Sequence, residues 1–242
     1  MGVPTQVCLQ WGPTGAAALA PGCDIAVVVD VLSFSTTVSV ASDARATVVP
    51  VREADAAAAD EVHRRDAALA VPREKAGPGD VSLSPQTFRR ARGLTRVVLP
   101  SPNGATVCAV LAAVGIPVVV ASLRNRRAVA THLARRGGRV LLVPAGERWP
   151  DGSLRPAIED LWGAGAVAAA LDDLGHTEAT DEAQAAAQAY RLVEHRIGEA
   201  LAACFSGQEL IERGYASDVA IAAELDASDA VPLLVDGELR AQ

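Results

Sequence analysis

The sequence predicts an α/β protein in which helices cover both faces of a mixed, mostly parallel sheet, giving three layers. Half of the 242 residues are hydrophobic, which is enough to fill a buried core and excludes global disorder. Short β-branched runs alternate with alanine-rich segments of helical length, the pattern of strands that are covered on both faces. The length suits one α/β domain, and we interpret residues 1–242 as a single domain.

Buried strands are expected wherever β-branched and other apolar residues form short runs between polar or Gly- and Pro-containing segments. In chain order, these runs are Gln6–Trp11, Ile25–Val31, Thr47–Val51, Ala67–Val71, Arg96–Pro100, Pro117–Ala121, Val140–Pro144 and Val231–Val235.

Helices are expected in the alanine-rich segments between the strands, and several begin behind a Ser, Thr, Asn or Asp that can cap free amide groups. The segment Glu178–Cys204 is polar on one side and almost free of β-branched residues, so we interpret it as one long helix or a helical insertion. The expected helix starts lie near Ser35, Arg52, Gly104, Asn125, Ala157, Thr180, Gly207 and Asp218.

Two segments of the chain, Val27–Val49 and Val97–Val119, resemble each other. This similarity indicates two related strand–loop–helix–strand units and would divide the domain into halves of about 1–90 and 91–242. Alanine-rich sequences align with one another easily, so chance similarity is the alternative. The segment Arg73–Gln86, which contains Gly77-Pro78-Gly79, is expected to be a surface loop near the boundary between the halves.

The charge balance and the cysteines limit the kind of partner. With 22 basic and 29 acidic side chains the formal net charge is −7, which disfavours binding to a nucleic-acid backbone. The four cysteines lie far apart, as in proteins of a reducing cytoplasm, and no run approaches the ~20 apolar residues of a membrane helix. We therefore expect a cytoplasmic protein with a small polar substrate and no nucleic-acid or membrane partner; homo-oligomerisation is left open.

The first candidate site follows the expected strand Ile25–Val31. Asp30 lies near the end of this strand, and the next helix opens with the hydroxyl residues Ser35, Thr36 and Thr37. Ligands of open α/β sheets collect at such strand ends, where helix N-termini offer amides to phosphate. Asp30 can hold a hard cation or orient water. The alternative is that these residues only cap the helix.

Two further loops have the same position between a strand and a helix. Asn103 and Gly104 form a tight turn in which the amide of Asn103 can both donate and accept. Asn125 and Arg126 lie among three arginines at the start of the next helix, and guanidinium groups pair well with phosphate or sulfonate. The alternatives are a simple turn and a solvated basic helix start.

A fourth candidate region is acidic and contains Glu147, Glu159 and Asp160. Magnesium prefers oxygen ligands and keeps several waters, so one or two carboxylates with a substrate phosphate suffice to bind it. Glu159 and Asp160 are adjacent on an expected helix, so at most one of them should point squarely at a site. The alternative is that both acids only favour the helix N-terminus.

Several other signals do not indicate function. The run GAGAVA at 163–168 resembles a dinucleotide fingerprint, but it follows a helical segment, and close helix packing explains its glycines. The chain has no Walker motif, no cysteine-phosphatase loop and no second Asp two residues after Asp30. Zinc is not expected, because the histidines occupy scattered positions on polar helical faces: His63, His132, His176 and His195.

Taken in order along the chain, the segments DVLSFSTT, SPNGAT, SLRNRR, AGE, EDLWGAGA and SGQELIERGYASDV resemble the 2-phosphosulfolactate phosphatase family. The resemblance implies an α/β/α fold and magnesium-dependent hydrolysis of 2-phosphosulfolactate to sulfolactate and phosphate, a step towards coenzyme M. The positions that match the family's motifs are Asp30, Ser35, Thr36, Thr37, Asn103, Gly104, Asn125, Glu147, Glu159 and Asp160.

Ser33 departs from the family pattern, in which this position is commonly Arg, and SPNGA stands where TTNGT is common. Losing a guanidinium from an anion-binding loop weakens phosphate binding or alters substrate choice unless another arginine replaces it. The expected replacements are Arg124, Arg126 and Arg155.

The resulting hypothesis is a phosphomonoester hydrolase with Asp30 and Glu147 as catalytic residues. Magnesium is expected on Asp30, Glu159 and Asp160, and a small phosphorylated acid on Ser35, Thr36, Thr37, Asn103, Gly104, Asn125 and Arg126. Direct attack by water and a covalent intermediate are both open. The alternatives are a phosphatase of the same fold with another small phosphorylated acid as substrate, and a non-catalytic protein that binds phosphate or sulfonate.

Overall fold

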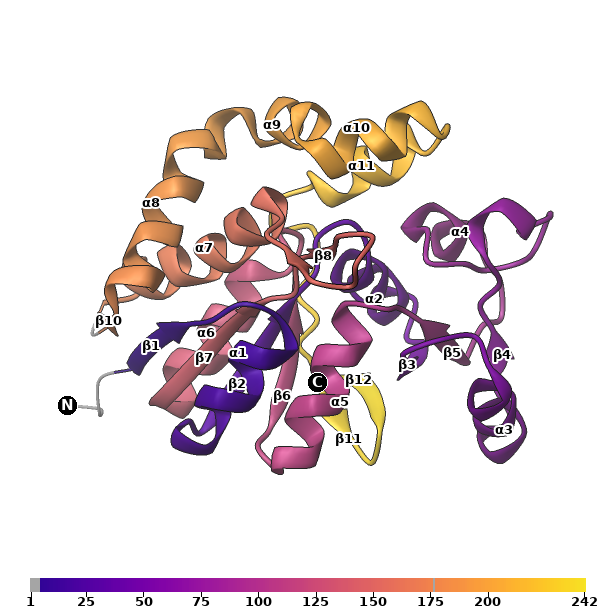
Figure 1. The fold of residues 1–242 in the computed structure, drawn as a ribbon, viewed down its shortest axis with the longest axis horizontal. Helices are drawn as coiled ribbons and strands as arrows, with labels where there is room; N and C mark the ends of the chain where they lie inside the picture. The colour runs from indigo at the N-terminus through magenta and orange to yellow at the C-terminus, as the bar shows by residue number, and fades with distance from the viewer. Residues whose placement is uncertain (1–4, 176) are drawn as a thin grey trace.

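The structure is a computed structural model and describes residues 5–175 and 177–242. Helices cover both faces of one large sheet, so the predicted three-layer α/β/α fold is confirmed (Figure 1). In spatial order, the strands of this sheet are β10 (Thr177–Ala179), β1 (Thr5–Leu9), β7 (Gly138–Pro144), β2 (Ile25–Val29), β6 (Val118–Ala121), β11 (Pro232–Val235), β12 (Glu238–Ala241), β3 (Thr47–Val51), β5 (Arg96–Pro100) and β4 (Ala68–Leu69).

The sheet consists of two parallel blocks joined by an antiparallel hairpin. The first block contains β10, β1, β7, β2 and β6, and the second contains β3, β5 and β4. The hairpin of β11 and β12 lies between them and pairs antiparallel with β6 on one side and β3 on the other. Because three antiparallel pairings separate β6 from β3, the two blocks run in opposite directions.

Strand β2 shows why an unbroken apolar run forms the middle of a block. All five of its residues are buried. Ala26 and Val28 belong to one hydrophobic cluster, and Val27 and Val29 belong to the cluster on the opposite face. Since successive side chains of a strand point to opposite faces, a strand covered on both sides needs apolar residues at every position.

Helices α1, α2 and α5 supply residues to one of these clusters, and α6, α7 and α8 supply residues to the other.

None of the helices in the described part of the chain is long and apolar enough to cross a membrane. The α-helices are α1 (Gly12–Leu19), α2 (Phe34–Asp43), α3 (Ala56–Arg65), α4 (Pro85–Arg90), α5 (Gly104–Val114), α6 (Arg126–Arg136), α7 (Ile158–Asp173), α8 (Asp181–Val193), α9 (Ile197–Ala203), α10 (Phe205–Glu212) and α11 (Ala216–Ala222). Short 3-10 turns cover Ala20–Gly22, Arg73–Lys75 and Glu194–Arg196.

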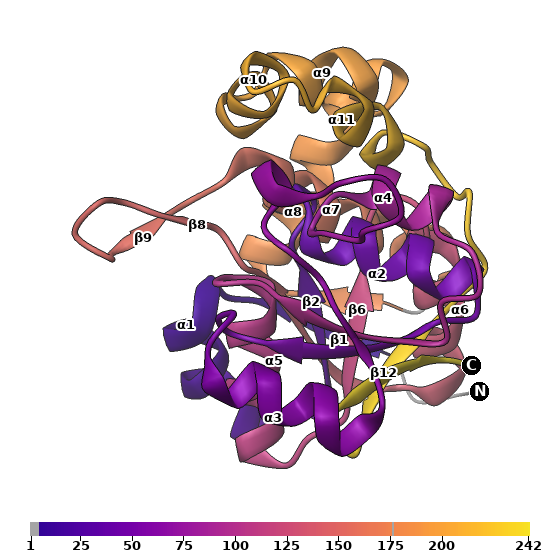
Figure 2. The same ribbon diagram turned by 90° about the vertical axis from the view of Figure 1, so that its right-hand side faces the viewer.

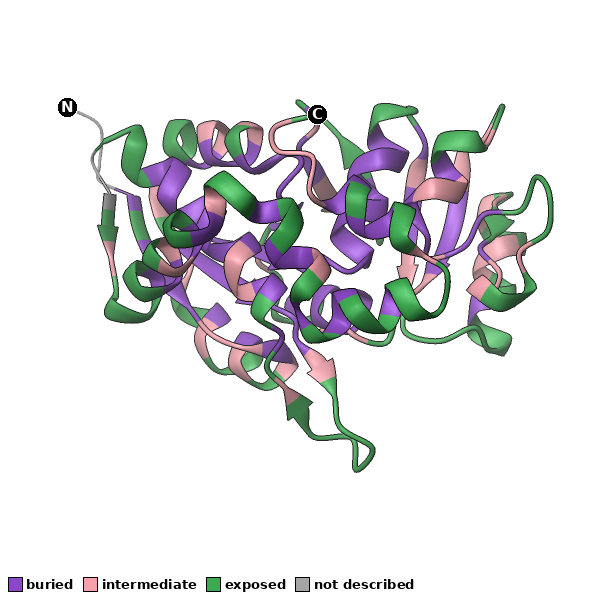
Figure 3. Cartoon of the chain, turned by 90° about the horizontal axis from the view of Figure 1, so that it is seen from above, coloured by how far each residue is buried: buried purple, intermediate pink, exposed green. Residues whose placement is uncertain are grey.

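Helices α9, α10 and α11 form a helical cap above the body of the molecule (Figures 1 and 2). The cap is tied down where the Ser84 hydroxyl donates to Asp218 of α11, at 2.6 Å. A second extension is the hairpin of β8 (Glu147–Arg148) and β9 (Leu154–Arg155), which projects from the body (Figure 2). Its tip is largely exposed (Figure 3).

The two similar segments of the sequence both fold as strand, helix and strand. The first forms β2, α2 and β3, and the second forms β5, α5 and β6. Each unit crosses from one block to the other, because β2 pairs with β6 while β3 pairs with β5. Strands from residues 1–90 and 91–242 therefore interleave in one sheet.

Two expectations about local structure hold only in part. Glu178–Cys204 is not one helix: Glu178 pairs with Gln6 in the sheet, and 3-10 residues Glu194–Arg196 separate α8 from α9. The segment Arg73–Gln86 is not simply a surface loop, because Ser82 and Ser84 are buried and Arg73 points inward. Hydrogen bonds from these serines to Thr87 and Asp218 offset the cost of their burial.

The glycines of α7 confirm the interpretation as close packing. A Cβ on Gly163 would lie 2.6 Å from Val31 Cγ2, and a Cβ on Gly165 would lie 2.0 Å from the carbonyl oxygen of Ala186 in α8. Only glycine lets α7 approach the end of β2 and the backbone of α8 this closely.

Replacing Gly165 with alanine tests this packing. Gly165→Ala should lower the free energy of unfolding by about 1–3 kcal/mol, because α8 must move away from α7. Gly198→Ala is the matched control: its Cβ would meet Ala223 Cβ at an ordinary 3.7 Å, so that change should be neutral or slightly stabilising. Chemical denaturation of both variants makes the comparison, and equal stability would contradict it.

Candidate active site

Four acidic side chains gather where the loops after β2, β5 and β7 meet the first turn of α7. Asp30, Glu159 and Asp160 are buried, with relative exposures of 5%, 2% and 3%, and Glu147 is half-buried. Burial of several carboxylates in one region is unfavourable unless hydrogen bonds or cations compensate. The partners of each acid therefore indicate what the site can hold.

Asp30 joins the loop after β2 to the loop after β5. Its Oδ1 accepts a hydrogen bond from the amide of Phe34 at 3.2 Å, and its Oδ2 accepts one from the amide of Gly104 at 2.9 Å. The first bond caps α2, as the alternative interpretation of this loop expects, and the second connects residues that are distant in sequence. Asp30 is thus both a cap and a member of the acidic cluster.

Gly104 is required by this contact. A Cβ at position 104 would lie 2.8 Å from Asp30 Oδ2 and 2.3 Å from Phe34 Cδ1. Any larger residue would displace either the carboxylate or the buried ring of Phe34, so the glycine sets the distance between the two loops.

Asp160, in the first turn of α7, joins the loop after β2 to the loop after β7. Its Oδ1 accepts from the amide of Val31 at 2.7 Å, and its Oδ2 accepts from the amide of Gly146 at 2.8 Å. The adjacent Glu159 raises the pKa values of Asp30 and Glu147, so its carboxylate lies near both. Both neighbours are buried in the cluster, and the expectation that at most one of them points squarely at a site stays a prediction.

Glu147 meets Asn103 across the same region. The Asn103 side chain donates from Nδ2 to Glu147 Oε2 at 2.8 Å, which joins the loop after β5 to hairpin β8–β9. Asp30, Asn103 and Glu147 therefore converge on one place although they are far apart in sequence. A cavity of about 240 Å³ borders Asn103 and Glu147 on the side of α1.

The pKa values of the acids reflect burial among like charges. Burial and neighbouring acids raise the pKa of Asp30 to about 6 and that of Glu147 to about 7, and they raise the pKa of Asp160 well above its usual range. Hydrogen bonds from Phe34, Gly104 and Asn103 act in the opposite direction but do not outweigh burial. The cluster therefore favours a bound proton or a bound cation.

The start of α5 supplies free hydrogen-bond donors beside this cluster. The amide of Gly104 binds Asp30, and the amide of Val107 binds the carbonyl of Asn103. Within the described residues, the amides of Ala105 and Thr106 make no hydrogen bond. Free amides and the helix dipole make such a terminus suitable for phosphate.

The three hydroxyls of the first loop have backbone acceptors. Ser35 donates to Val28 O at 3.4 Å, Thr36 to Val31 O at 2.7 Å and Thr37 to Leu83 O at 3.1 Å. These bonds hold the loop in shape. Their expected role as donors to phosphate stays a prediction.

The structure places Asn125 and Arg126 in contacts away from the acids. Asn125 Oδ1 accepts from the Ser122 amide, and its Nδ2 donates to the carbonyl of Ala230. Arg126 forms ion pairs with Asp226 and Glu194. Both residues fasten the chain around the end of β6, and their role in substrate binding is untested.

The guanidinium group nearest to Ser33 belongs to a residue that sequence reasoning missed. Arg73 Nη2 donates to Ser33 Oγ at 2.6 Å and to Leu83 O at 2.9 Å. Of the expected replacements for the missing arginine, Arg124 pairs with Asp43 and Glu224, and Arg155 with Glu209. The sequence separation of 40 between Arg73 and Ser33 left no local signal for this contact.

Among residues 5–175 and 177–242, no three His, Cys, Asp or Glu side chains are arranged to hold one metal ion. Of the histidines, His63 and His195 are exposed, His132 is half-buried, and His176 lies outside the described residues. The oxygen donors of the acidic cluster still suit magnesium, which binds through one or two carboxylates, water and substrate phosphate.

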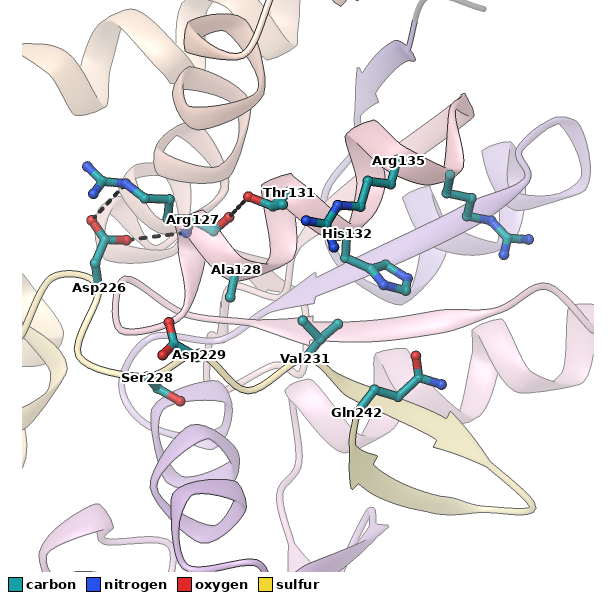
Figure 4. Close-up of a pocket in the computed structure, with 11 residues that line it drawn as sticks. Arg127, Ala128, Thr131, His132, Arg135, Asp226, Ser228, Asp229, Val231 and Gln242 are labelled. Carbon is teal, nitrogen blue, oxygen red and sulfur yellow. Dashed lines mark hydrogen bonds and ion pairs between the residues drawn. The ribbon is translucent and has the colours of Figure 1, made fainter. Parts of the chain in front are cut away.

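A cavity larger than the one beside Asn103 and Glu147 lies elsewhere. It has a volume of about 900 Å³ and lies between α6 and the segment that precedes β11, lined by Arg127, His132, Arg135 and Asp226 among others (Figure 4). It contains none of the four acids of the cluster. Cavity size therefore does not locate the candidate active site, whereas the convergence of distant polar residues does.

Comparison with known proteins gives a consistent result. Residues 17–237 match the family model of 2-phosphosulpholactate phosphatase. A protein of Deinococcus radiodurans named probable 2-phosphosulfolactate phosphatase is 35% identical over 222 residues, which cover 89% of each chain. A protein of Methanothermobacter thermautotrophicus named 2-phosphosulfolactate phosphatase is 30% identical over 221 residues, which cover 90% of each chain.

The contact between Gly104 and Asp30 can be tested by adding one methyl group. Gly104→Ala should lower the free energy of unfolding by about 1–3 kcal/mol through overpacking. A crystal structure of the variant should show the Asp30 carboxylate displaced from the amide at position 104. Gly22→Ala is the control, since its Cβ would meet only the flexible Arg139 Nη1 at 3.6 Å. An unmoved Asp30 would contradict the close packing.

The acidic cluster also predicts a pH dependence of stability. A raised pKa in the folded state means that folding favours the protonated acid, so its stabilising effect is complete at low pH and is lost as pH rises. Without divalent cations, the free energy of unfolding should therefore fall between about pH 4 and pH 7. Glu147→Gln should make this fall smaller, whereas Glu182→Gln, which changes an exposed acid with a lowered pKa, should not. Denaturation at several pH values measures both slopes, and identical slopes would refute the assignment.

Proposed function

The chain belongs to the 2-phosphosulpholactate phosphatase family, and we propose that it is a magnesium-dependent hydrolase of 2-phosphosulfolactate that produces sulfolactate and phosphate. Such a reaction serves the synthesis of coenzyme M. The observation that carries the proposal is the convergence of Asp30, Asn103 and Glu147 beside the free amides of α5. We propose a free small phosphorylated acid as the partner and no nucleic acid or membrane.

Phosphate is expected at the N-terminus of α5. The free amides of Ala105 and Thr106 point out of the helix end, and the helix dipole adds positive potential there. An incoming phosphate would lie between this terminus and the acidic cluster, and that position requires a cation to offset the carboxylates.

Asp30 and Glu159 are the residues that we propose to hold magnesium. Both side chains are buried, and the charge of Glu159 raises the pKa of Asp30. Glu159 accepts no hydrogen bond from a backbone amide in the described residues. Asp160 lies in the same cluster and, like Asp30, binds an amide of a site loop through each of its oxygens, so it is the third proposed ligand. When bound, magnesium would neutralise the phosphate oxygens and polarise the phosphorus towards attack.

Glu147 is the proposed general base and acid. Its pKa of about 7 lets it accept a proton from the attacking water and return it to the leaving hydroxyl of sulfolactate. In this reaction the water oxygen bonds to phosphorus as the ester P–O bond breaks. The hydrogen bond from Asn103 orients the carboxyl group. A cysteine nucleophile is disfavoured, since burial and Glu159 raise the pKa of the Cys204 thiol to about 12.

The proposal predicts that Asp30→Asn reduces phosphate release from 2-phosphosulfolactate by at least about 100-fold, because it removes the charge that holds the metal. Asp24→Asn is the matched control at the other end of β2, where the exposed Asp24 carboxylate accepts a hydrogen bond from the amide of Arg139. It should retain wild-type activity. Chelation should abolish turnover in the wild type, and added magnesium should restore it.

A panel of phosphomonoesters in the same assay separates the proposed substrate from other small phosphorylated acids. Full activity of Asp30→Asn, or full activity after chelation, would refute the metal-dependent mechanism. Ligand-induced thermal stabilisation without any product would indicate a binding protein instead.

A further inference from the structure

Arg73 is a mostly buried cation beside the acidic cluster, and the catalytic scheme above does not use it. Only 12% of its side chain is exposed, and its charge acts on Asp30. One nitrogen, Nη2, makes the contacts to Ser33 and Leu83. Its Nε is buried and has no hydrogen-bond partner within the described residues. A buried donor without an acceptor is costly, so an additional acceptor is expected.

The acid that accompanies Arg73 forms a long ion pair with it, and Asp218 Oδ2 has no hydrogen-bond partner in the described residues. Asp218 Oδ2 lies 3.6 Å from Arg73 Nη2, and the other carboxylate oxygen accepts from Ser84 at 2.6 Å. By contrast, Arg213 on the outer side of Tyr215 is more than half exposed and forms an ion pair with Glu74. Arg213 borders the same cavity as Arg73, but it is exposed and its Nη2 is paired, whereas the Nε of Arg73 is buried and unpaired in the described residues.

The surroundings of Arg73 have room for a ligand group. Arg73 lines a cavity of about 220 Å³ together with Val71, Leu83 and Pro100. Pro100 ends β5 and is followed by the loop that carries Asn103 and Gly104. Arg73 reaches the site itself through Ser33, whose hydroxyl it binds directly before α2, and through its charge on Asp30. The ring of Tyr215, 5.4 Å from the guanidinium carbon, packs over Arg73 from the helical cap and limits its movement.

We propose that Arg73 binds the acidic group that the substrate carries beside its phosphoester, and that it thereby sets the preference of the site for phosphorylated acids over uncharged phosphomonoesters. This inference rests on the proposed phosphatase function. A planar guanidinium with unused donors suits a carboxylate or a sulfonate. The phosphate itself stays with α5 and the metal, so Arg73 is a specificity-determining residue.

The test compares Arg73→Met with the wild type on substrates that differ in the second group. Phospholactate carries a carboxylate, 2-phosphooxyethanesulfonate carries a sulfonate, and p-nitrophenyl phosphate carries neither. For the variant, KM should rise by about 10- to 100-fold on at least one acid-bearing substrate, as expected for a lost charged hydrogen bond, and by no more than about twofold on p-nitrophenyl phosphate. The acid-bearing substrate that is affected identifies the group that Arg73 binds.

Arg65→Met is the matched control. The Arg65 side chain is similarly buried, at 14% exposure, and is paired with Glu238. Arg65 ends α3 and lies near the start of β5, where its carbonyl accepts a hydrogen bond from Arg96. Asn103 follows the other end of β5. Arg65→Met should lose stability but keep the KM values of the wild type.

Several outcomes would overturn the proposal. An equal rise in KM on all three substrates would show a structural role or a contact with phosphate, and unchanged KM values would show no contact. If Arg73→Met does not fold, Arg73→Lys replaces it and should show the same selectivity with a smaller effect. Calorimetric binding of sulfolactate, which contains no phosphate, should weaken by at least about tenfold in the variant. This measurement needs no turnover, so a wild type that binds sulfolactate but releases no phosphate would refute the proposed function and leave the role of Arg73 testable.

Discussion

The hydrogen bonds that two buried aspartates accept from backbone amides hold the site together. Asp30 binds the amide of Gly104, and Asp160 binds the amides of Val31 and Gly146. The loops after β2, β5 and β7 and the first turn of α7 are thereby fixed to one another without a basic side chain between them. The same arrangement leaves negative charge in a buried place, which raises the pKa values of the acids and favours a cation. The same buried aspartates therefore hold the loops together and supply the negative charge that favours a cation.

Much of the fold could be predicted because it is encoded locally. The runs at Thr47–Val51 and Arg96–Pro100 form β3 and β5 with the expected bounds, and each needs only a short β-branched stretch. The candidate loops were found for the same reason, since an apolar strand, a polar turn and an alanine-rich helix follow one another in the chain. Asp30, Asn103 and Glu147 lie in such loops and do meet. Asp30 and Glu147 follow β2 and β7 of the first block, whereas Asn103 follows β5 of the second block. No local pattern in the sequence shows that the loops of these two blocks meet.

The parts that could not be predicted depend on contacts between distant segments. Arg73 lies in a Gly- and Pro-containing stretch that is typical of a surface loop, and the contacts of partly buried Leu83 with α2 and of buried Ser84 with the helical cap turn it inward. Glu178–Cys204 has helical composition throughout, but pairing with β1 draws its first residues into the sheet. Strand β12 was not expected either, although Asp236 and Gly237, with φ values of 52° and 76°, form the kind of turn that Asp-Gly indicates.

The position of β12 has a consequence for how the protein is made. In the described residues, the two blocks are joined in the sheet only through the hairpin of β11 and β12, which residues 232–241 contribute. Every acid of the cluster precedes residue 161, yet the two half-sheets cannot join until the much later residues 232–241 are made. Until then the inner borders of β6 and β3 are unpaired edges, open to other strands. Chaperone contact during synthesis is accordingly expected to concentrate on these two borders.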